Sequence, residues 1–363
     1  MRSDAERSFL IEAGWGEAQI APLAGDASTR SYRRLRLGDR RAVLMDAPPS
    51  AETAPCPPGA SVEERRRLGY NALARLAGAK LDAFVCIDSE LRAAGLSAPE
   101  VYAADPETGF ALLEDLGDAL FSRAIPAGAD EASLYGAAVD ALAAIHGRRP
   151  PIEIICNGAK HRLLDYDEAA LTAEIELLPE WYWPHAVGTP ASADAKAEFL
   201  AAWSAPLASL VGGAGALVLR DYHADNLIWL PDRSGPARAG LLDFQDAVIG
   251  HPAYDLVSLL QDVRREVSPA LEAAMLARYV AARRERDAMF DEDAFRAAYA
   301  VLGAQRNTKI VGIFARLANR DGKRAYLDYM PRARALLTAN LSHPALAPVR
   351  GWIDRNAPEA LEL

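Results

Sequence analysis

Residues 216–246 of this 363-residue chain read ALVLRDYHADNLIWLPDRSGPARAGLLDFQD. The three apolar runs ALVL, LIWL and AGLL have the length of strands, and the polar stretch PDRSGPAR between the last two indicates a hairpin loop. Asp221 and Asn226 fall between the first two runs, and Asp243 follows the third. If LIWL and AGLL pair antiparallel, the start of one strand lies beside the end of the other. Hairpin geometry therefore predicts that Asn226 and Asp243 come within reach of one metal ion.

The chemistry of these three side chains favours phosphoryl transfer. A carboxylate and an amide oxygen suit Mg²⁺, which usually binds through few protein ligands and through substrate phosphates. Asp221 is then a separate carboxylate that can orient an attacking hydroxyl and accept its proton, as in kinases. The alternative is that Asp and Asn stand here only because turns favour them. The spacing D-x-x-x-x-N, followed by an apolar strand that ends in D-F, favours the functional interpretation.

The rest of the chain shows two kinds of sequence pattern, one typical of strands and one typical of helices, which together predict an α+β protein of two lobes. Short apolar runs within residues 16–48 and a hairpin over 101–118 predict strands, and apolar spacing predicts a helix over 82–94. The Pro- and Ala-rich residues 48–60 are expected to form a loop. From Glu131 onward we expect long helices, interrupted only by the β-rich island at 216–246. The prediction is a small antiparallel-sheet lobe over 1–117 and a larger, mainly helical lobe over 118–363.

Composition excludes several classes of partner. The chain has 50 acidic and 40 basic residues, a formal net charge of −10, and nucleic-acid binding requires a basic surface instead. No stretch approaches the ~20 apolar residues that span a bilayer, and the first residues lack a secretory signal. Cys56, Cys86 and Cys156 are spaced for neither a disulfide framework nor a zinc site. We expect a cytoplasmic protein without nucleic-acid or membrane partners; its oligomeric state stays open.

Two motifs resemble those of a known family. RDYHADN and LLDFQDA are similar to the catalytic-loop and metal-binding motifs of the aminoglycoside-phosphotransferase-like kinases, which share the protein-kinase fold, and the resemblance covers nearly the whole chain. LAGDASTRSYRRL resembles the nucleotide loop, RAVLMDAPP the third strand and LLEDLGD the hinge between lobes. Together with DFQDAVIG and QRNTKIVGIFARL, these motifs resemble one branch, the sugar kinases of cell-wall recycling. That branch phosphorylates the anomeric hydroxyl of N-acetylmuramate or N-acetylglucosamine.

The resemblance implies a bilobal protein-kinase-like fold, with ATP and Mg²⁺ as cofactors and a small sugar as acceptor. It implies transfer of the γ-phosphoryl group to the anomeric hydroxyl, which gives a sugar 1-phosphate in peptidoglycan recycling. Asp221 would be the catalytic base, and Asn226 and Asp243 the metal ligands. The nucleotide would contact a loop and the hinge, at Gly25, Ser28, Thr29, Glu114, Asp115 and Leu116.

One position departs from the pattern. Kinases place a lysine on the third strand, where it pairs with nucleotide phosphates, but the aligned residue here is Met45. Arg30 or Arg34 could supply the missing charge, because an arginine fork suits phosphate oxygens; the alternative is that both are solvated on the strand face. The missing lysine would also fit a non-catalytic nucleotide-binding regulator. The presence of the base together with both metal ligands favours activity.

The acceptor site is indicated by charge and by aromatic residues. N-acetylmuramate carries a carboxylate, which favours a cation, whereas the kinases of aminoglycosides or choline-like alcohols should present acidic pockets. Arg306 and Lys309 lie on one side of an expected basic helix, and the alternative is a solvated helix face. The candidate acceptor contacts are Trp181, Asp225, Asp246 and Arg306. GHPAYDLVSLL resembles the segment that supports the catalytic loop in this family, which implies that Asp255 holds that loop by hydrogen bonds. The preferred sugar stays open.

Overall fold

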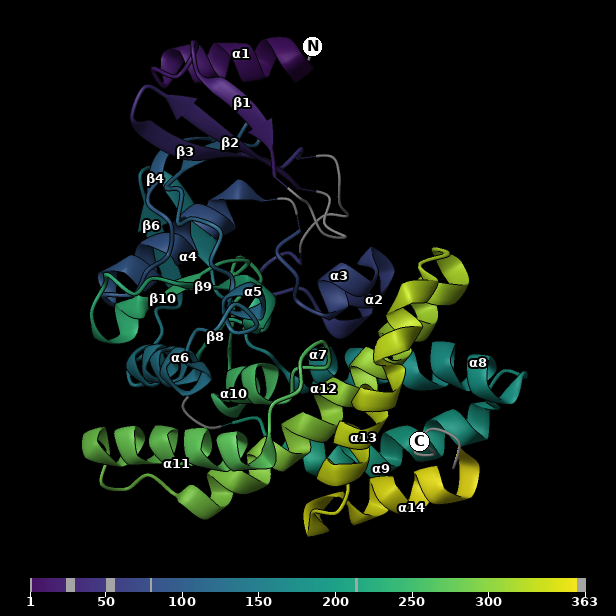
Figure 1. Cartoon of the computed structure of the whole chain (residues 1–363). Coiled ribbons are helices and arrows are strands. Elements are labelled where there is room, and N and C mark those ends of the chain that lie inside the picture. Colours follow the sequence, from purple (N-terminus) through teal and green to yellow (C-terminus); the bar gives the residue numbers. More distant parts are fainter. Residues whose placement is uncertain (1, 24–29, 50–55, 79, 213–214, 358–363) are drawn as a thin grey trace. The chain divides into compact units, whose positions relative to one another are not determined.

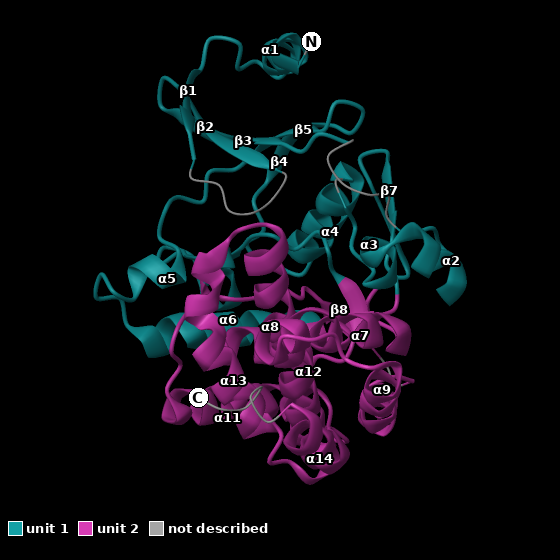
Figure 2. Cartoon of the chain, turned by 90° about the vertical axis from the view of Figure 1, so that its right-hand side faces the viewer, with its two compact units in different colours: residues 1–145, 151–164, 225–247 teal, residues 146–150, 165–224, 248–363 magenta. Residues whose placement is uncertain are grey.

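The computed structural model describes residues 2–23, 30–49, 56–78, 80–212 and 215–357. They form two compact units (Figure 2): unit 1 comprises residues 1–145, 151–164 and 225–247, and unit 2 comprises 146–150, 165–224 and 248–363. The chain therefore passes from one unit to the other after residues 145, 150, 164, 224 and 247. Unit 1 carries an antiparallel sheet and unit 2 is mainly helical, which confirms the α+β class. The lobe boundary at residue 117 stays a prediction.

The sheet of unit 1 has five strands in the order β1-β2-β3-β5-β4 (Figures 1 and 2; β5 is labelled in Figure 2), and all neighbouring strands are antiparallel. The strands are β1 Gln19–Pro22, β2 Ser31–Leu37, β3 Arg40–Asp46, β4 Val101–Asp105 and β5 Phe110–Leu113. These bounds confirm the strands predicted within residues 16–48 and the hairpin predicted over 101–118. Of the loop expected over 48–60, residues 50–55 lie outside the described residues.

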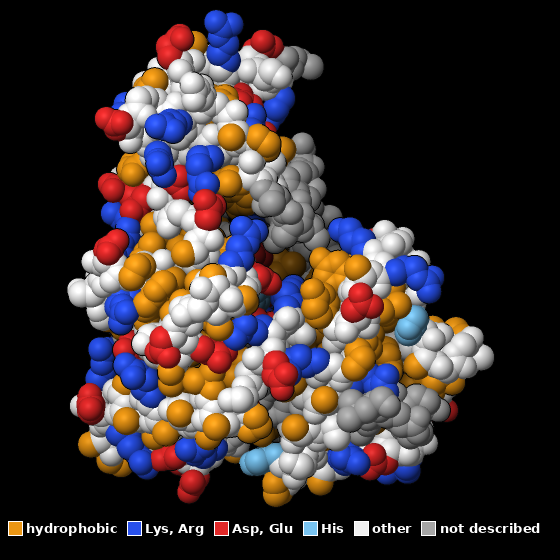
Figure 3. Space-filling model, in the orientation of Figure 1, with side chains coloured by type: hydrophobic (Ala, Val, Ile, Leu, Met, Phe, Trp, Pro, Cys, Tyr) orange, Lys and Arg blue, Asp and Glu red, His pale blue; other side chains and the backbone are white. Residues whose placement is uncertain are grey.

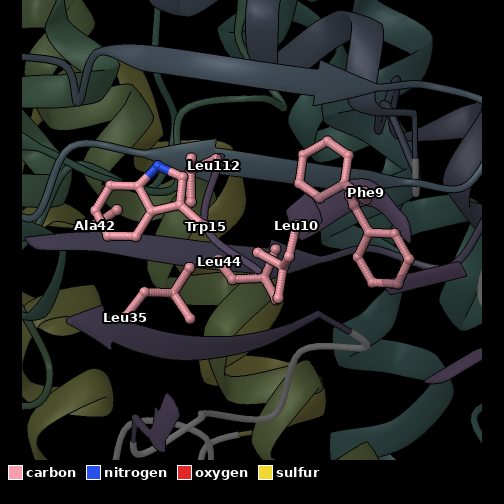
Figure 4. Packing of buried hydrophobic residues seen from close by; sticks show 8 residues of the cluster. Phe9, Leu10, Trp15, Leu35, Ala42, Leu44 and Leu112 are labelled. Carbon is pink, nitrogen blue, oxygen red and sulfur yellow. The ribbon is translucent and has the colours of Figure 1, made fainter. Parts of the chain in front are cut away.

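Helix α1, Arg2–Glu12, packs on one face of this sheet (Figure 4). The Phe9 ring lies 5.8 Å from the Phe110 ring. The buried cluster between helix and sheet consists of Phe9, Leu10, Trp15, Leu35, Ala42, Leu44, Phe110 and Leu112. Because side chains alternate along a strand, Met45 faces the side of β3 opposite to Leu44. Met45 is 1% exposed, so the third strand presents a buried thioether where kinases carry an ammonium group.

The other helices of unit 1 are α2 Val62–Leu68, α3 Tyr70–Leu73, α4 Leu81–Ala93, α5 Phe121–Ala124 and α6 Glu131–His146, of which the last residue belongs to unit 2. Helix α4 confirms the helix predicted over 82–94. It packs against a hairpin of β6 Glu153–Cys156 and β7 Ala159–Arg162. The expectation of a single β-rich island after Glu131 was therefore wrong. Asn157 and Gly158 have φ angles of 50° and 80°, the left-handed conformations that a two-residue hairpin turn requires.

The island at 216–246 contains the expected hairpin. Strands β9 Leu227–Trp229 and β10 Ala239–Leu241 pair antiparallel, with Leu227 opposite Leu241. The short helix η2, Ala224–Asn226, precedes β9, and η3, Gly235–Arg238, precedes β10. The first run, β8 Ala216–Val218, belongs to unit 2 and pairs with β11 Val248–Gly250. Strand β11 was not predicted from the sequence.

Unit 2 is built around helix α12, Glu292–Arg320, which packs against α7, α10, α13 and the π-helical segment η1. The other elements of this unit are α7 Glu168–Ile175, η1 Leu178–Tyr182, α8 Trp183–Val187, α9 Ala193–Ala208, α10 Ala253–Leu260, α11 Pro269–Arg286, η4 Arg324–Tyr329, α13 Met330–Asn340, η5 Pro344–Leu346 and α14 Ala347–Asn356. Gly312 allows the close approach of α12 to η1, because a Cβ atom there would lie 2.4 Å from the carbonyl carbon of Leu177.

The face shown in Figure 3 carries hydrophobic side chains as well as charges of both signs. On the face shown in Figure 3, Lys and Arg side chains are interspersed with Asp and Glu. None of the helices that the structure describes is both apolar enough and long enough to cross a membrane.

Candidate active site

Asp221 follows β8 in unit 2, and its backbone is held by Asp255. The Asp255 carboxylate is fully buried in the first turn of α10, and it accepts the Leu219 and Arg220 N–H groups, each at 2.8 Å. His146 Nε2 lies 3.3 Å from the same carboxylate. Arg220 has a φ of 71°, which is rare for a residue with a side chain. The structure thus confirms that Asp255 holds the loop by hydrogen bonds.

Arg306 lies in α12 beside Asp221. Its Nη2 atom is 3.6 Å from Asp221 Oδ1, and its Nη1 donates to the Arg220 carbonyl at 3.1 Å and to the Tyr254 hydroxyl at 3.0 Å. Arg306 is buried, so it is not part of a solvated helix face. Burial alone would raise the pKa of Asp221, but the charges of Arg306 and Lys309 outweigh it and lower that pKa to about 2. Asp221 is therefore ionised at neutral pH.

A buried charge network surrounds Glu174 of α7. Its carboxylate pairs with Arg220, accepts from Lys309 Nζ at 2.8 Å and from Gln305 Nε2 at 3.0 Å, and also accepts the Tyr166 hydroxyl. Glu174 is fully buried, which would raise its pKa, yet the charges of Lys309 and Arg220 lower that pKa to about 2. Sequence reasoning missed this network. The available signal was a pair of glutamates, Glu174 and Glu176, within the mostly apolar run LTAEIELL.

Asn226 and Asp243 lie together in unit 1. The Leu242 N–H donates to the Asn226 carbonyl at 3.0 Å, which extends the β9–β10 ladder by one residue. Asn226 therefore stands opposite the residue that precedes Asp243, as the hairpin predicts. Asp243 has a φ of 57°, and its carboxylate accepts from Gln245 Nε2 at 2.9 Å and from Arg30 Nη1 at 3.2 Å.

The convergence of Asp221 with Asn226 and Asp243 stays a prediction, because Asp221 belongs to unit 2 and the other two belong to unit 1. Across the described ranges, no group of three or more His, Cys, Asp or Glu side chains is placed to hold a metal ion. The predicted metal site is not a group of this type, because its two protein ligands are the carboxylate of Asp243 and the amide of Asn226.

Only some of the residues predicted to contact the nucleotide are among those that the structure describes. Gly25, Ser28 and Thr29 lie outside the described residues. Glu114 and Leu116, just beyond β5, are half-buried. The Glu114 N–H donates to the Glu100 carbonyl at 2.8 Å, and the Glu114 carboxylate pairs with Arg233. The contacts of Glu114 and Leu116 with adenine stay predictions.

Arg34 of β2 binds the hinge segment. Its Nη2 donates to Asp115 at 2.9 Å, and its Nη1 donates to Asp118 at 2.7 Å. Arg34 is therefore neither a solvated strand-face charge nor free to bind another anion in this structure.

The remaining candidates are divided between the two units. In unit 1, Asp246 accepts the Ala77 N–H at 2.6 Å, and Asp225 is half-buried in η2. In unit 2, Trp181 is half-buried in η1. Contacts of these residues, and of Arg306, with an acceptor stay predictions.

Sequence comparison places the chain among phosphotransferases. A sequence model described as "Phosphotransferase enzyme family" matches residues 19–290. A Caulobacter vibrioides protein named N-acetylmuramate/N-acetylglucosamine kinase is 51% identical over 357 residues, which cover 98% of this chain and 97% of the relative. A Pseudomonas aeruginosa protein of the same name is 34% identical over 367 residues, which cover 98% of this chain and 94% of that relative.

Solved structures share the fold at low sequence identity. The microcompartment-associated aminopropanol kinase aligns with a TM-score of 0.57 and 15% identity, over 96% of this chain and 98% of its own. A choline/ethanolamine kinase family protein from Mesorhizobium loti aligns with a TM-score of 0.55 and 16% identity, over 97% and 100%. The motifs, the fold and these sequence matches agree, and the chain belongs to the phosphotransferase enzyme family.

Proposed function

We propose that this protein is an ATP-dependent kinase that phosphorylates the anomeric hydroxyl of an amino sugar, N-acetylmuramate or N-acetylglucosamine. The product is the sugar 1-phosphate, and the proposed setting is peptidoglycan recycling in the cytoplasm. The observation that carries the proposal is the 51% identity, over 98% of the chain, to the Caulobacter kinase that is named for both sugars.

Asp221 is proposed to act on the acceptor. With a pKa lowered to about 2, it is present as the carboxylate at neutral pH, and its side chain is 43% exposed. It can therefore accept a hydrogen bond from the sugar hydroxyl and orient that oxygen. As the oxygen bonds to the γ-phosphorus and the bond from that phosphorus to ADP breaks, the hydroxyl proton passes to Asp221 and then to water. Orientation and electrostatics supply most of the acceleration in this class of reaction.

Asn226 and Asp243 fit the magnesium ion that this chemistry uses. One carboxylate and one amide oxygen are hard donors, and Mg²⁺ completes its coordination with water and substrate phosphates. The Asp243 side chain is 34% exposed, so it is only partly shielded from solvent. When bound, the ion would offset negative charge on the phosphates. Asn226 and Asp243 would hold it from adjacent ends of one hairpin.

An acceptor panel tests the proposal. The purified protein is incubated with ATP, Mg²⁺ and one of N-acetylmuramate, N-acetylglucosamine, kanamycin or choline, and ADP release is coupled to an optical readout. We expect turnover with at least one amino sugar, a 1-phosphate rather than a 6-phosphate by phosphorus NMR, and loss of turnover in Asp221→Asn.

Two results would contradict the proposal. Turnover with kanamycin or choline, and none with either amino sugar, would identify a kinase of another alcohol. Binding of ATP without phosphorylation of any acceptor, unchanged in Asp221→Asn, would identify a nucleotide-binding regulator.

A further inference from the structure

The third strand of the sheet lacks the cation that kinases of this fold place there. Met45 stands between Tyr32 of β2 and Ala111 of β5 and is 1% exposed. Its thioether carries no charge and cannot compensate nucleotide phosphates. If the chain binds ATP, a cation from another position has to contact these phosphates.

The arginines at the start of β2 differ in their partners. Arg33 pairs with Glu6 at 2.6 Å, and Arg34 binds the hinge segment as described above. Neither of these two guanidinium groups contacts a proposed metal ligand or the proposed base. Arg30 instead contacts Asp243, one of the two proposed metal ligands.

The Arg30 side chain is 8% exposed, with Nη1 at 3.2 Å from Asp243 Oδ1 and Nη2 at 3.3 Å from the Gly78 carbonyl oxygen. Charge-assisted hydrogen bonds are usually shorter, about 2.7–2.9 Å. The same Asp243 oxygen also accepts from Gln245 Nε2 at 2.9 Å. Oδ1 of Asp243 therefore accepts from both Gln245 and Arg30, and the ion pair to Arg30 is long.

We propose that Arg30 replaces the lysine of the third strand and exchanges partners when the nucleotide binds. In the free protein Arg30 neutralises Asp243. When Asp243 takes the metal ion, Arg30 turns to the phosphates of the nucleotide. This inference rests on the proposed function, because it requires that a magnesium–nucleotide complex binds at Asp243.

The exchange affects the binding of a divalent cation in opposite directions without and with the nucleotide. Arg30 competes with a divalent cation for the Asp243 carboxylate when no nucleotide is present, because two cations repel each other at one carboxylate. Arg30 strengthens binding once phosphates are present, because they attract both cations. Metal and nucleotide therefore assist each other's binding through Arg30.

Arg30→Met tests the inference, with Arg36→Met as the matched control. Arg36 is an exposed residue of β2, the strand that begins one residue after Arg30, so its variant removes the same charge a short distance along the chain. The affinity for Mn²⁺ alone is measured by electron paramagnetic resonance, and the affinities for MgATP and for adenosine by calorimetry. We expect Arg30→Met to bind Mn²⁺ several-fold more tightly, MgATP about tenfold more weakly, and adenosine as the wild type does. Arg36→Met should resemble the wild type in all three, and Arg30→Lys should recover part of the MgATP affinity.

If Arg30→Met binds all three ligands (Mn²⁺, adenosine and MgATP) more weakly than the wild type, Arg30 only supports the local structure. That result would overturn the inference. Wild-type values for all three ligands would overturn it as well. Neither result bears on the acceptor panel. Conversely, a chain that phosphorylates no sugar but shows the opposite shifts for Mn²⁺ and MgATP would retain the Arg30 exchange and lose the proposed function.

Discussion

The Nη2 atom of Arg306 lies 3.6 Å from Oδ1 of Asp221. The arginine is buried, whereas the aspartate side chain is 43% exposed. The guanidinium group is held in place by the Arg220 carbonyl and the Tyr254 hydroxyl. The protein thus presents a carboxylate to solvent and keeps a fixed cation behind it, which explains how a partly desolvated Asp221 remains ionised.

Arg306→Met should move the acid limb of the pH–rate profile to higher pH. Asp221 acts as the ionised form, and burial raises its pKa while Arg306 is the largest charge that lowers it to about 2. Without Arg306 the pKa of Asp221 rises, so the rate falls off at a higher pH, with a shift of about one unit or more. The measurement is kcat against pH.

Arg306→Lys should restore most of the original profile, and Arg320→Met provides a matched control. Arg320 lies on the same helix but pairs with Asp321 at its exposed end. An unchanged acid limb in Arg306→Met would mean that Arg306 does not set the ionisation of Asp221.

Glu174→Gln should destabilise the fold. The substitution leaves the buried Arg220 and the partly buried Lys309 without their carboxylate, and breaking a buried ion pair in this way costs about 3–5 kcal/mol. The pKa of Glu174 is lowered from 4.5 to about 2, so its contribution is present above about pH 4.5 and is lost as the pH falls towards 2. Denaturant unfolding at pH 7 and at pH 3 measures both effects.

Glu180→Gln is the control for Glu174→Gln, because Glu180 is an exposed residue of the neighbouring segment η1. Two results would contradict the role of Glu174. One is an equal loss of unfolding free energy in Glu174→Gln and Glu180→Gln. The other is a difference between Glu174→Gln and the wild type that is the same at pH 7 and at pH 3.

Asp255→Asn should loosen the loop that carries Asp221. Only one oxygen remains to accept the Leu219 and Arg220 N–H groups, and a buried donor without an acceptor costs about 1–3 kcal/mol. We expect faster hydrogen exchange at these two amides, together with a lower kcat. Asp293→Asn, in the exposed first turn of α12, should leave both amides protected. Unchanged exchange in Asp255→Asn would show that the loop does not depend on this carboxylate.

Gly312→Ala should lower the free energy of unfolding by about 1–3 kcal/mol, the usual cost of overpacking. The added Cβ would lie 2.4 Å from the Leu177 carbonyl carbon and 2.5 Å from its oxygen. Gly351→Ala, within α14, would meet only the flexible end of Arg355 at 3.3 Å, and alanine is the better helix former. Opposite changes in stability are therefore expected from the same substitution in two helices. Equal changes would show that α12 and η1 can separate at little cost.

Local patterns predicted much of the fold. The apolar runs gave the strands of the five-stranded sheet and the β9–β10 hairpin, because period-two burial and turn residues are encoded in adjacent positions. The hairpin at Glu153–Arg162 was missed although Asn157–Gly158 is a typical hairpin signal. The Ala- and Leu-rich surroundings had favoured helix there. Strand β11 is three residues long and pairs with β8, so nothing in its own sequence distinguishes it.

The relation between two site residues was predictable where it depends on how far apart they stand in the sequence. The pairing of Asn226 with the strand before Asp243 was predicted in this way, whereas the role of Asp255 was predicted from the resemblance of its segment to that of a known family. The partners of the cations were not, because an ion pair between Arg306 and Asp221 joins residues 85 positions apart in the chain. The partners of Arg34 were unpredictable for the same reason. The sequence indicates a charged residue on a strand, but only the tertiary structure shows that Asp115 and Asp118 bind it.

The repeated passage of the chain between its two units makes the protein hard to divide. A chain that stops at residue 224 lacks β9 and β10 of unit 1 as well as the last helices of unit 2, and a chain that begins at residue 165 lacks the whole five-stranded sheet. Neither unit corresponds to one uninterrupted segment of the gene. Two fragments split at residue 224 therefore have to be combined to restore either unit.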